Sequence, residues 1–254
     1  MKMRSVLVAL SLSFAVTLPA VAAVPAPAAM AVDANKILAE IDRRAAVFSD
    51  QQYDATMKVF KGGELKKTLE FEMTMKGLDK QFLVFTAPGD VAGMKVLMQD
   101  AKTLYIYTPE FKKVRRVAAH MQNQGFMGST FTYENMTEVQ MSPFYDATLE
   151  GREGSETTLS LTPKEGIEKT YKRIAVVIDS KKGGVTELRY YDGAGNLVRT
   201  QKRGGWTKVD GELMPTEVEM TDHKTGDSTV IELRNVRVNQ GVEDDLFSRR
   251  MLLR

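Results

Sequence analysis

The side chains that most often do chemistry in proteins are scarce in this sequence. It has no cysteine and two histidines, His120 and His223. Without thiols the chain can form no disulfide, Fe–S cluster or cysteine nucleophile. A zinc site would need carboxylates almost alone, which is unusual for that metal, and a histidine relay has only two candidate centres. We therefore expect no metal site.

The remaining catalytic candidates lack supporting motifs. His120 and Ser129 lie in one segment and could form a hydrolytic dyad, but the sequence indicates no third group and contains neither a G-x-S-x-G elbow nor an H-E-x-x-H helix. Among 33 acidic residues no glycosidase-like pair stands out; Asp90, Asp100 and Glu134 fit turns, caps or salt bridges better. The sequence predicts a non-enzymatic protein without a cofactor.

The N-terminus has the pattern of a secretory signal, residues 1–23. A basic start with Lys2 and Arg4 precedes an apolar stretch of about 13 residues and the small residues of a cleavage site. The apolar stretch is shorter than the roughly 20 residues of a membrane-spanning helix. No cysteine follows the cleavage site to carry a lipid anchor. We therefore expect a periplasmic protein, exported through a cleaved signal and not lipid-anchored.

Composition predicts one neutral, folded domain. The chain has 254 residues, of which 43% are hydrophobic and 27% charged, typical of a globular protein. Removal of the signal leaves 33 basic and 33 acidic residues, and this balance argues against nucleic-acid binding. Residues 24–33 are rich in Pro and Ala and are expected to form a flexible lead-in. Residues 34–254 are expected to form a single, monomeric domain.

Hydrophobic periodicity predicts one helix followed by many strands. Residues 33–48 show a helical stripe with Asp33 as N-cap. From Gln51 the period changes to two, and a hairpin follows around residues 61–64. Further strands are expected at 81–86, 94–99, 103–107, 113–118, 147–153, 156–162, 172–179, 185–192, 197–206, 212–222 and 228–238. This pattern favours a mainly β fold, a large curved antiparallel sheet.

One segment, residues 119–139, breaks the alternation. It combines glycines with the apolar side chains of Met121, Phe126, Met127, Phe131, Tyr133 and Met136. Glycines and polar residues make a poor core, so we interpret the segment as a partly helical, movable cover over an apolar cavity. The thirteen methionines left after signal removal either fill the core or line a soft binding surface.

Several blocks resemble the outer-membrane lipoprotein-sorting family of LolA-like periplasmic carriers. They are Phe85-Thr86-Ala87-Pro88, Leu104-Tyr105-Ile106-Tyr107-Thr108-Pro109 and, most specifically, Gly125-Phe126-Met127-Gly128-Ser129 with Phe131-Thr132-Tyr133-Glu134. Thr130 stands where an Asp is common in one branch of the family. Residues 238–252 are similar to the way that branch ends.

The resemblance implies an unclosed β-barrel whose concave apolar face is covered by an N-terminal helix and a helical lid and holds acyl chains of lipids or lipoproteins. The expected acyl-binding residues are Met73, Met94, Phe126, Met127, Phe131, Tyr133 and Met136. Expected partners are an inner-membrane transporter and an outer-membrane acceptor, with Lys113, Arg115 and Arg116 as contacts to a partner or an anionic head group.

Other readings stay open. The basic residues of 112–116 and those near Trp206 (Arg199, Lys202, Arg203 and Lys208) also fit the solvent side of a strand. The same fold also resembles envelope-stress sensors, and an accessory protein of a lipid or efflux transporter would share these features.

Overall fold

The computed structural model describes residues 27–100, 103–118, 121, 123–137 and 139–254. The predicted signal segment, residues 1–23, lies outside them. Helix α1 (Pro27–Ala45) begins in the predicted lead-in and ends three residues before the expected Phe48. Proline is favourable at the first helical position, and the alanines after it favour a helix. Asp33 therefore lies inside the helix and is not its N-cap.

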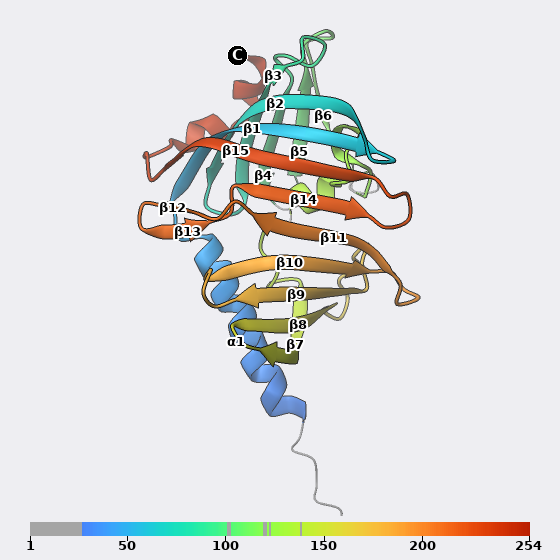
Figure 1. The fold of residues 1–254 in the computed structure, drawn as a ribbon. Helices are drawn as coiled ribbons and strands as arrows, with labels where there is room; N and C mark the ends of the chain where they lie inside the picture. Colours follow the sequence, from blue (N-terminus) through green and yellow to red (C-terminus); the bar gives the residue numbers. More distant parts are fainter. Residues whose placement is uncertain (1–26, 101–102, 119–120, 122, 138) are drawn as a thin grey trace, which may run out of the picture.

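Thirteen strands form one open antiparallel sheet. Their order is β6-β5-β4-β3-β2-β1-β15-β14-β11-β10-β9-β8-β7, so β6 and β7 are its two edges (Figure 1). The strands are β1 (Asp50–Lys61), β2 (Glu64–Lys76), β3 (Lys80–Ala87), β4 (Lys95–Asp100), β5 (Thr103–Thr108), β6 (Lys113–Arg116), β7 (Tyr145–Glu153), β8 (Glu156–Pro163), β9 (Arg173–Asp179), β10 (Gly184–Tyr191), β11 (Leu197–Gly204), β14 (Glu217–Asp222) and β15 (Ser228–Val238).

A small hairpin, β12 (Thr207–Val209) with β13 (Glu212–Met214), leaves the main sheet between β11 and β14. The sequence predicted two longer strands here, 197–206 and 212–222. Both ranges were wrong in extent, because the first strand ends at Gly204 and the second is divided into β13 and β14. The left-handed backbone of Gly205, with φ of 60°, ends β11, and Pro215 interrupts the second strand because it cannot donate a ladder hydrogen bond.

The sheet curves around a concave apolar face, as predicted. Alternate residues of most strands point into one large cluster, for example Leu83 and Phe85 on β3 and Val96 and Met98 on β4. Helix α1 packs against β7 and β10. The side-chain oxygen of Asn35 accepts the Ala147 N–H at 2.8 Å, which protects part of the β7 edge.

The opposite, convex face of β3–β5 is covered by the C-terminal segment. Two 3₁₀ helices, η3 (Asp244–Phe247) and η4 (Arg249–Leu253), place Phe247 and Leu252 on Phe82 and Leu97. Both faces of these strands are therefore buried, which explains why their sequences are apolar at successive positions.

Asp50 fixes the start of this C-terminal segment. Its carboxylate is 2% exposed and accepts the backbone N–H groups of Gln240, Gly241 and Val242 at 2.8–3.3 Å. Burial opposes ionisation of this carboxyl, but these three donors and the Ser49 hydroxyl outweigh it and hold the pKa of Asp50 below its ordinary value.

Replacement of this carboxylate is expected to make the protein less stable and less sensitive to acid. Because the folded-state pKa is depressed, Asp50 stabilises the native state above pH 4, and this contribution is lost as the pH falls through the folded-state pKa. Asp50→Asn should lower the free energy of unfolding by about 2 kcal/mol near neutral pH and flatten its decline in acid. Urea titrations from pH 3 to 7 measure both effects; equal curves for variant and wild type would contradict this role.

Candidate functional site

The segment that crosses the concave face, residues 123–137, is called the plug here. It contains a 3₁₀ turn, η2 (Phe126–Gly128), and a short helix, α2 (Tyr133–Thr137). A bridge between Gly125 and Thr132 closes the turn, and the Phe126 N–H donates to the Phe131 carbonyl at 2.7 Å. The turn requires left-handed backbone at Met127 (φ 53°). The predicted irregular, partly helical segment is confirmed.

Helix α2 starts with a reciprocal cap. The Thr132 hydroxyl accepts the Asn135 N–H at 3.1 Å, and the Asn135 side-chain oxygen accepts the Thr132 N–H at 3.0 Å. This is the capping-box arrangement with Asn in the third position. It fixes the direction in which the chain leaves the Phe126 turn and so determines where Tyr133 and Met136 lie.

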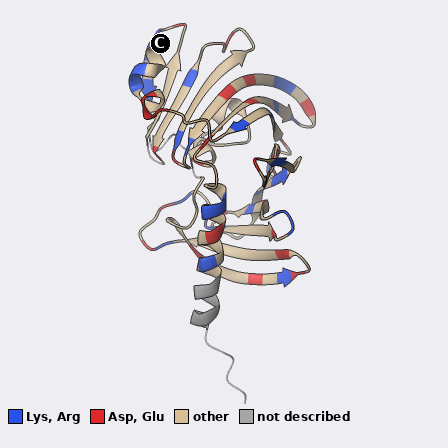
Figure 2. Cartoon of the chain, turned by 90° about the vertical axis from the view of Figure 1, so that its left-hand side faces the viewer, with Lys and Arg blue, Asp and Glu red and all other residues tan. Residues whose placement is uncertain are grey.

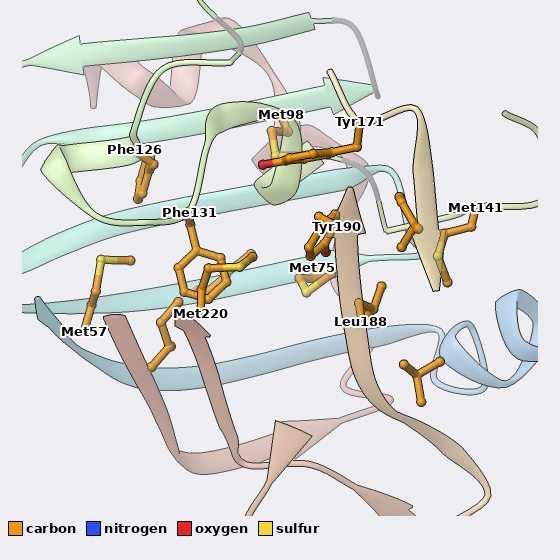
Figure 3. Close-up of a cluster of buried hydrophobic side chains, with 14 of the residues drawn as sticks. Met57, Met75, Met98, Phe126, Phe131, Met141, Tyr171, Leu188, Tyr190 and Met220 are labelled. Carbon is orange, nitrogen blue, oxygen red and sulfur yellow. The ribbon is translucent and has the colours of Figure 1, made fainter. Parts of the chain in front are cut away.

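The aromatic residues of the plug pack into the core of the sheet. The Phe126 ring lies 6.2 Å from that of Phe85 on β3 and 5.4 Å from that of Tyr133. Phe126 and Phe131 are 1% and 4% exposed. Figure 3 shows both pointing from the plug toward methionines of the core, among them Met57 and Met220.

Hydrogen bonds hold the plug to the sheet at its middle and near its C-terminal end. Thr130 donates its hydroxyl to the Met220 carbonyl at 2.8 Å and its N–H to the Thr229 hydroxyl at 3.0 Å. The Gln81 amide donates to the Met136 carbonyl at 3.2 Å. The expectation that polar residues make the segment poor core was therefore wrong, because Thr130 and its neighbours are buried with their hydrogen bonds satisfied.

Helix α1 holds the chain that follows the plug. The carboxylate of Asp42, 7% exposed, accepts the N–H groups of Met141 and Ser142 at 2.7–3.2 Å. The helix thus fixes the chain a few residues after the plug.

The structure brings together the seven residues predicted to bind acyl chains. Four of them, Met73, Met94, Phe126 and Phe131, are buried in the concave cluster, and the other three, Met127, Tyr133 and Met136, are half-buried against it. The cavity that remains beneath Phe126 and Met136 measures about 10 Å³. The plug side chains fill the space that an acyl chain would need on this part of the concave face.

The fold has clear counterparts among known proteins. A family model with the description "-like: Uncharacterized protein" matches residues 77–254. A DUF1329 family protein from Desulfovibrio piger superposes with a TM-score of 0.81 at 25% identity, covering 88% of this chain and 99% of that one. The chain belongs to the family that this model describes, and its fold is that of LolA-like proteins.

Two further solved structures show the LolA-like fold. A domain named for outer-membrane lipoprotein sorting from Vibrio parahaemolyticus has a TM-score of 0.79 at 23% identity, over 88% of this chain and all of that one. A LolA superfamily protein from Nitrosomonas europaea has a TM-score of 0.71 at 18% identity, over 86% and 98%. No match is found among the curated proteins.

The predicted contact residues Lys113, Arg115 and Arg116 lie exposed on the edge strand β6. Lys113 and Arg115 line an open groove of about 520 Å³ together with Arg249, Arg250 and Leu253 of η4. The Arg249 guanidinium lies 4.9 Å from the centre of the Tyr105 ring, and Arg250 pairs with Asp245. Figure 2 shows basic residues on the C-terminal helical turns. Charges on β6 also protect a free sheet edge from pairing with another chain.

The residues that could have suggested catalysis have structural partners. Ser129 bonds to the Phe131 backbone, and His223 Nε2 lies 2.8 Å from the Thr200 hydroxyl. His120, the other half of the expected dyad, lies outside the described residues. Within the described ranges no group of three or more His, Asp or Glu could hold a metal ion, and no helix is long and apolar enough to cross a membrane.

Sequence reasoning missed the residues that hold the plug and one arginine that faces the interior. Gln81 could have been found from strand alternation, because it lies on the same strand as Leu83 and Phe85 and points to the same face. For Arg203, as for Lys202 and Lys208, the sequence left open a solvated strand face or a contact with a head group or partner. Lys202 and Lys208 are exposed, but Arg203 lies opposite Val218, which packs on the concave cluster.

Proposed function

We propose that the protein is a non-enzymatic periplasmic carrier that binds acyl chains of lipids or lipoproteins on the concave face and releases them toward the outer membrane. The observation that carries the proposal is the plug, an aromatic and methionine-rich segment that covers an apolar half-barrel and is attached by a few hydrogen bonds. The family relationship and the predicted export signal support it.

Binding requires the plug side chains to give way to the ligand. Each methylene transferred from water to an apolar site contributes about 0.8 kcal/mol, so a long acyl chain supplies about 10 kcal/mol. That is of the same order as the free energy needed to displace the contacts of Phe126, Phe131 and Met136 and to break the Thr130 hydrogen bonds, each of which contributes about 1 kcal/mol. After release, the same side chains close over the empty face, so the apolar surface is not left in water.

Release needs an acceptor that attracts the loaded carrier. The groove between β6 and η4, lined by Lys113, Arg115 and Arg249 among others, suits an anionic membrane surface or an acidic face of a transporter or receptor. The apolar side chain of Leu253 in this groove is 64% exposed and adds contact area beside the positive charges.

The test is ligand binding by the protein purified after export. Native mass spectrometry, followed by lipid extraction, should show a co-purifying acylated molecule, and a neutral fluorescent probe such as diphenylhexatriene should bind and be displaced by it.

Met136→Glu, at the half-buried side of the plug, should weaken probe binding at least about tenfold because a charge then faces the apolar site. Transfer to vesicles should be faster when they contain phosphatidylglycerol than when they are neutral.

Leu65→Glu is the matched control, because Leu65 is 53% exposed in the β1–β2 hairpin; it should bind the probe like the wild type. An unloaded protein that takes up neither probe nor added acyl chain would overturn the carrier function. Recovery of a crosslinked protein partner instead would favour a sensor or an accessory of a transporter.

A further inference from the structure

A second apolar pocket, of about 210 Å³, opens at one end of the half-barrel, beside the last turns of α1 and the β12–β13 hairpin. It lies apart from the residues predicted to hold acyl chains. Three of its lining residues, Ile41, Met75 and Val185, belong to the concave cluster, so its floor is the apolar surface of the half-barrel. The other apolar walls include Phe48, Leu78, Trp206 and Leu213.

Arg203 is one of the residues that line this pocket. It is on β11 opposite Val218 and therefore faces the concave side of the sheet. Among the described residues no carboxylate pairs with its side chain, whereas the other arginine of the pocket, Arg44, pairs with Glu40 at 3.0 Å and donates to the Gly183 carbonyl at 3.1 Å. Burial lowers the pKa of Arg203, but a guanidinium stays charged at neutral pH.

The wall beside Arg203 is built to hold its shape. The indole N–H of Trp206 donates to the Arg203 carbonyl at 3.2 Å. The Trp206 ring lies against the backbone of Gly184 on β10, where an added Cβ would stand 3.3 Å from the ring. A side chain at this position would crowd the ring, so the glycine lets the indole lie close to β10 and narrow the pocket. Its volume is below the range of about 300–1,000 Å³ typical of pockets for drug-sized ligands, so it suits one chain and not several.

Arg203 is half-buried, and the apolar walls beside it reduce the competition from water. An anionic ligand group would therefore gain a charge-assisted contact with it. We propose that this pocket binds the acidic end of a single-chain amphiphile, with the Arg203 guanidinium pairing with the ligand's carboxylate or phosphate and the apolar walls taking the adjoining methylenes. The proposal rests on acyl-chain binding by the concave face and adds the head-group class to it. Fatty acids and lysophospholipids both present this chemistry.

The experiment compares ligands with the same chain and different ends. Dodecanoate, dodecyl phosphate and neutral 1-dodecanol are titrated into the exported protein by calorimetry and by displacement of diphenylhexatriene. Arg203→Gln should weaken binding of the preferred anion at least about tenfold, the loss expected for one charge-assisted pair, and leave dodecanol binding unchanged. The anion that loses more affinity when Arg203 is replaced shows whether the pocket prefers a carboxylate or a phosphate end.

Lys202→Gln is the matched control. Lys202 is the adjacent residue of β11, exposed on the opposite face, so its replacement removes the same charge from the same strand and should change none of the three affinities. If Arg203→Gln bound dodecanoate and dodecyl phosphate each as tightly as the wild type does, and both proteins still bound dodecanol, the head-group assignment alone would be overturned. If the wild type bound none of the three ligands or the probe, the carrier function itself would fall, and this proposal with it.

Discussion

Phe126→Asp is expected to expel the plug from the concave face and to lower the free energy of unfolding by about 4 kcal/mol or more. Loss of a buried Phe side chain costs about 3–5 kcal/mol by itself, and the new carboxylate would lie between Phe85 and Tyr133 without a counter-charge. Urea unfolding measures the loss of stability. Limited proteolysis within residues 123–137, and reduced binding of a neutral acyl probe, measure plug release.

Phe111→Asp is the matched control, since Phe111 is 54% exposed in the turn before β6. The same chemical change at this position should alter the free energy of unfolding by no more than about 0.5 kcal/mol. A plug variant as stable and as resistant to protease as this control would show that the plug does not pack in the core in solution.

Gly125→Ala is expected to open the plug turn through a single added methyl group. The new Cβ would stand 2.7 Å from the carbonyl oxygen of Ser129, a backbone atom that cannot move aside without breaking the turn. The backbone angles of Gly125, φ −62° and ψ 124°, suit alanine, so the effect is steric alone. We expect a loss of about 1–3 kcal/mol, measured by urea unfolding, with faster hydrogen exchange at the Phe126 N–H.

Gly151→Ala provides the comparison for this change. Gly151 lies on β7, and a Cβ built on it meets no atom within 4 Å. Its replacement should leave stability within about 0.5 kcal/mol of the wild type. If Gly125→Ala were equally harmless, the close approach of the turn to Ser129 would not be a constraint on plug closure.

The alternation of side chains was enough to predict the mainly β sheet. Leu83 and Phe85, or Val96 and Met98, point the same way because strand side chains repeat every two residues. The sequence placed most strands within a few residues of their observed bounds. It failed at Gly205 and Pro215, where long apparent strands break, and at the start of α1, where alanines extend the helix beyond the predicted cap.

The plug was located from its broken periodicity and its resemblance to a family block, but its packing was not predictable. Thr130 is buried only because Met220 and Thr229, about a hundred residues later in the chain, supply its hydrogen-bond partners. Local composition suggested a loose cover, since glycines and hydroxyl side chains rarely fill a core unless distant strands satisfy their polar groups.

By itself, then, the sequence determined the elements that depend on local periods and turns: the strands, the N-terminal helix, the irregular segment across the sheet and the absence of cysteine chemistry. Only the tertiary structure decided which face of each strand is concave and which charges face it. Arg203 and Lys202 are adjacent and carry the same charge, yet one lines an apolar pocket and the other meets water. The direction of each depends on how β11 pairs with β10 and β14, because register, and not residue type, assigns a strand's side chains to its two faces.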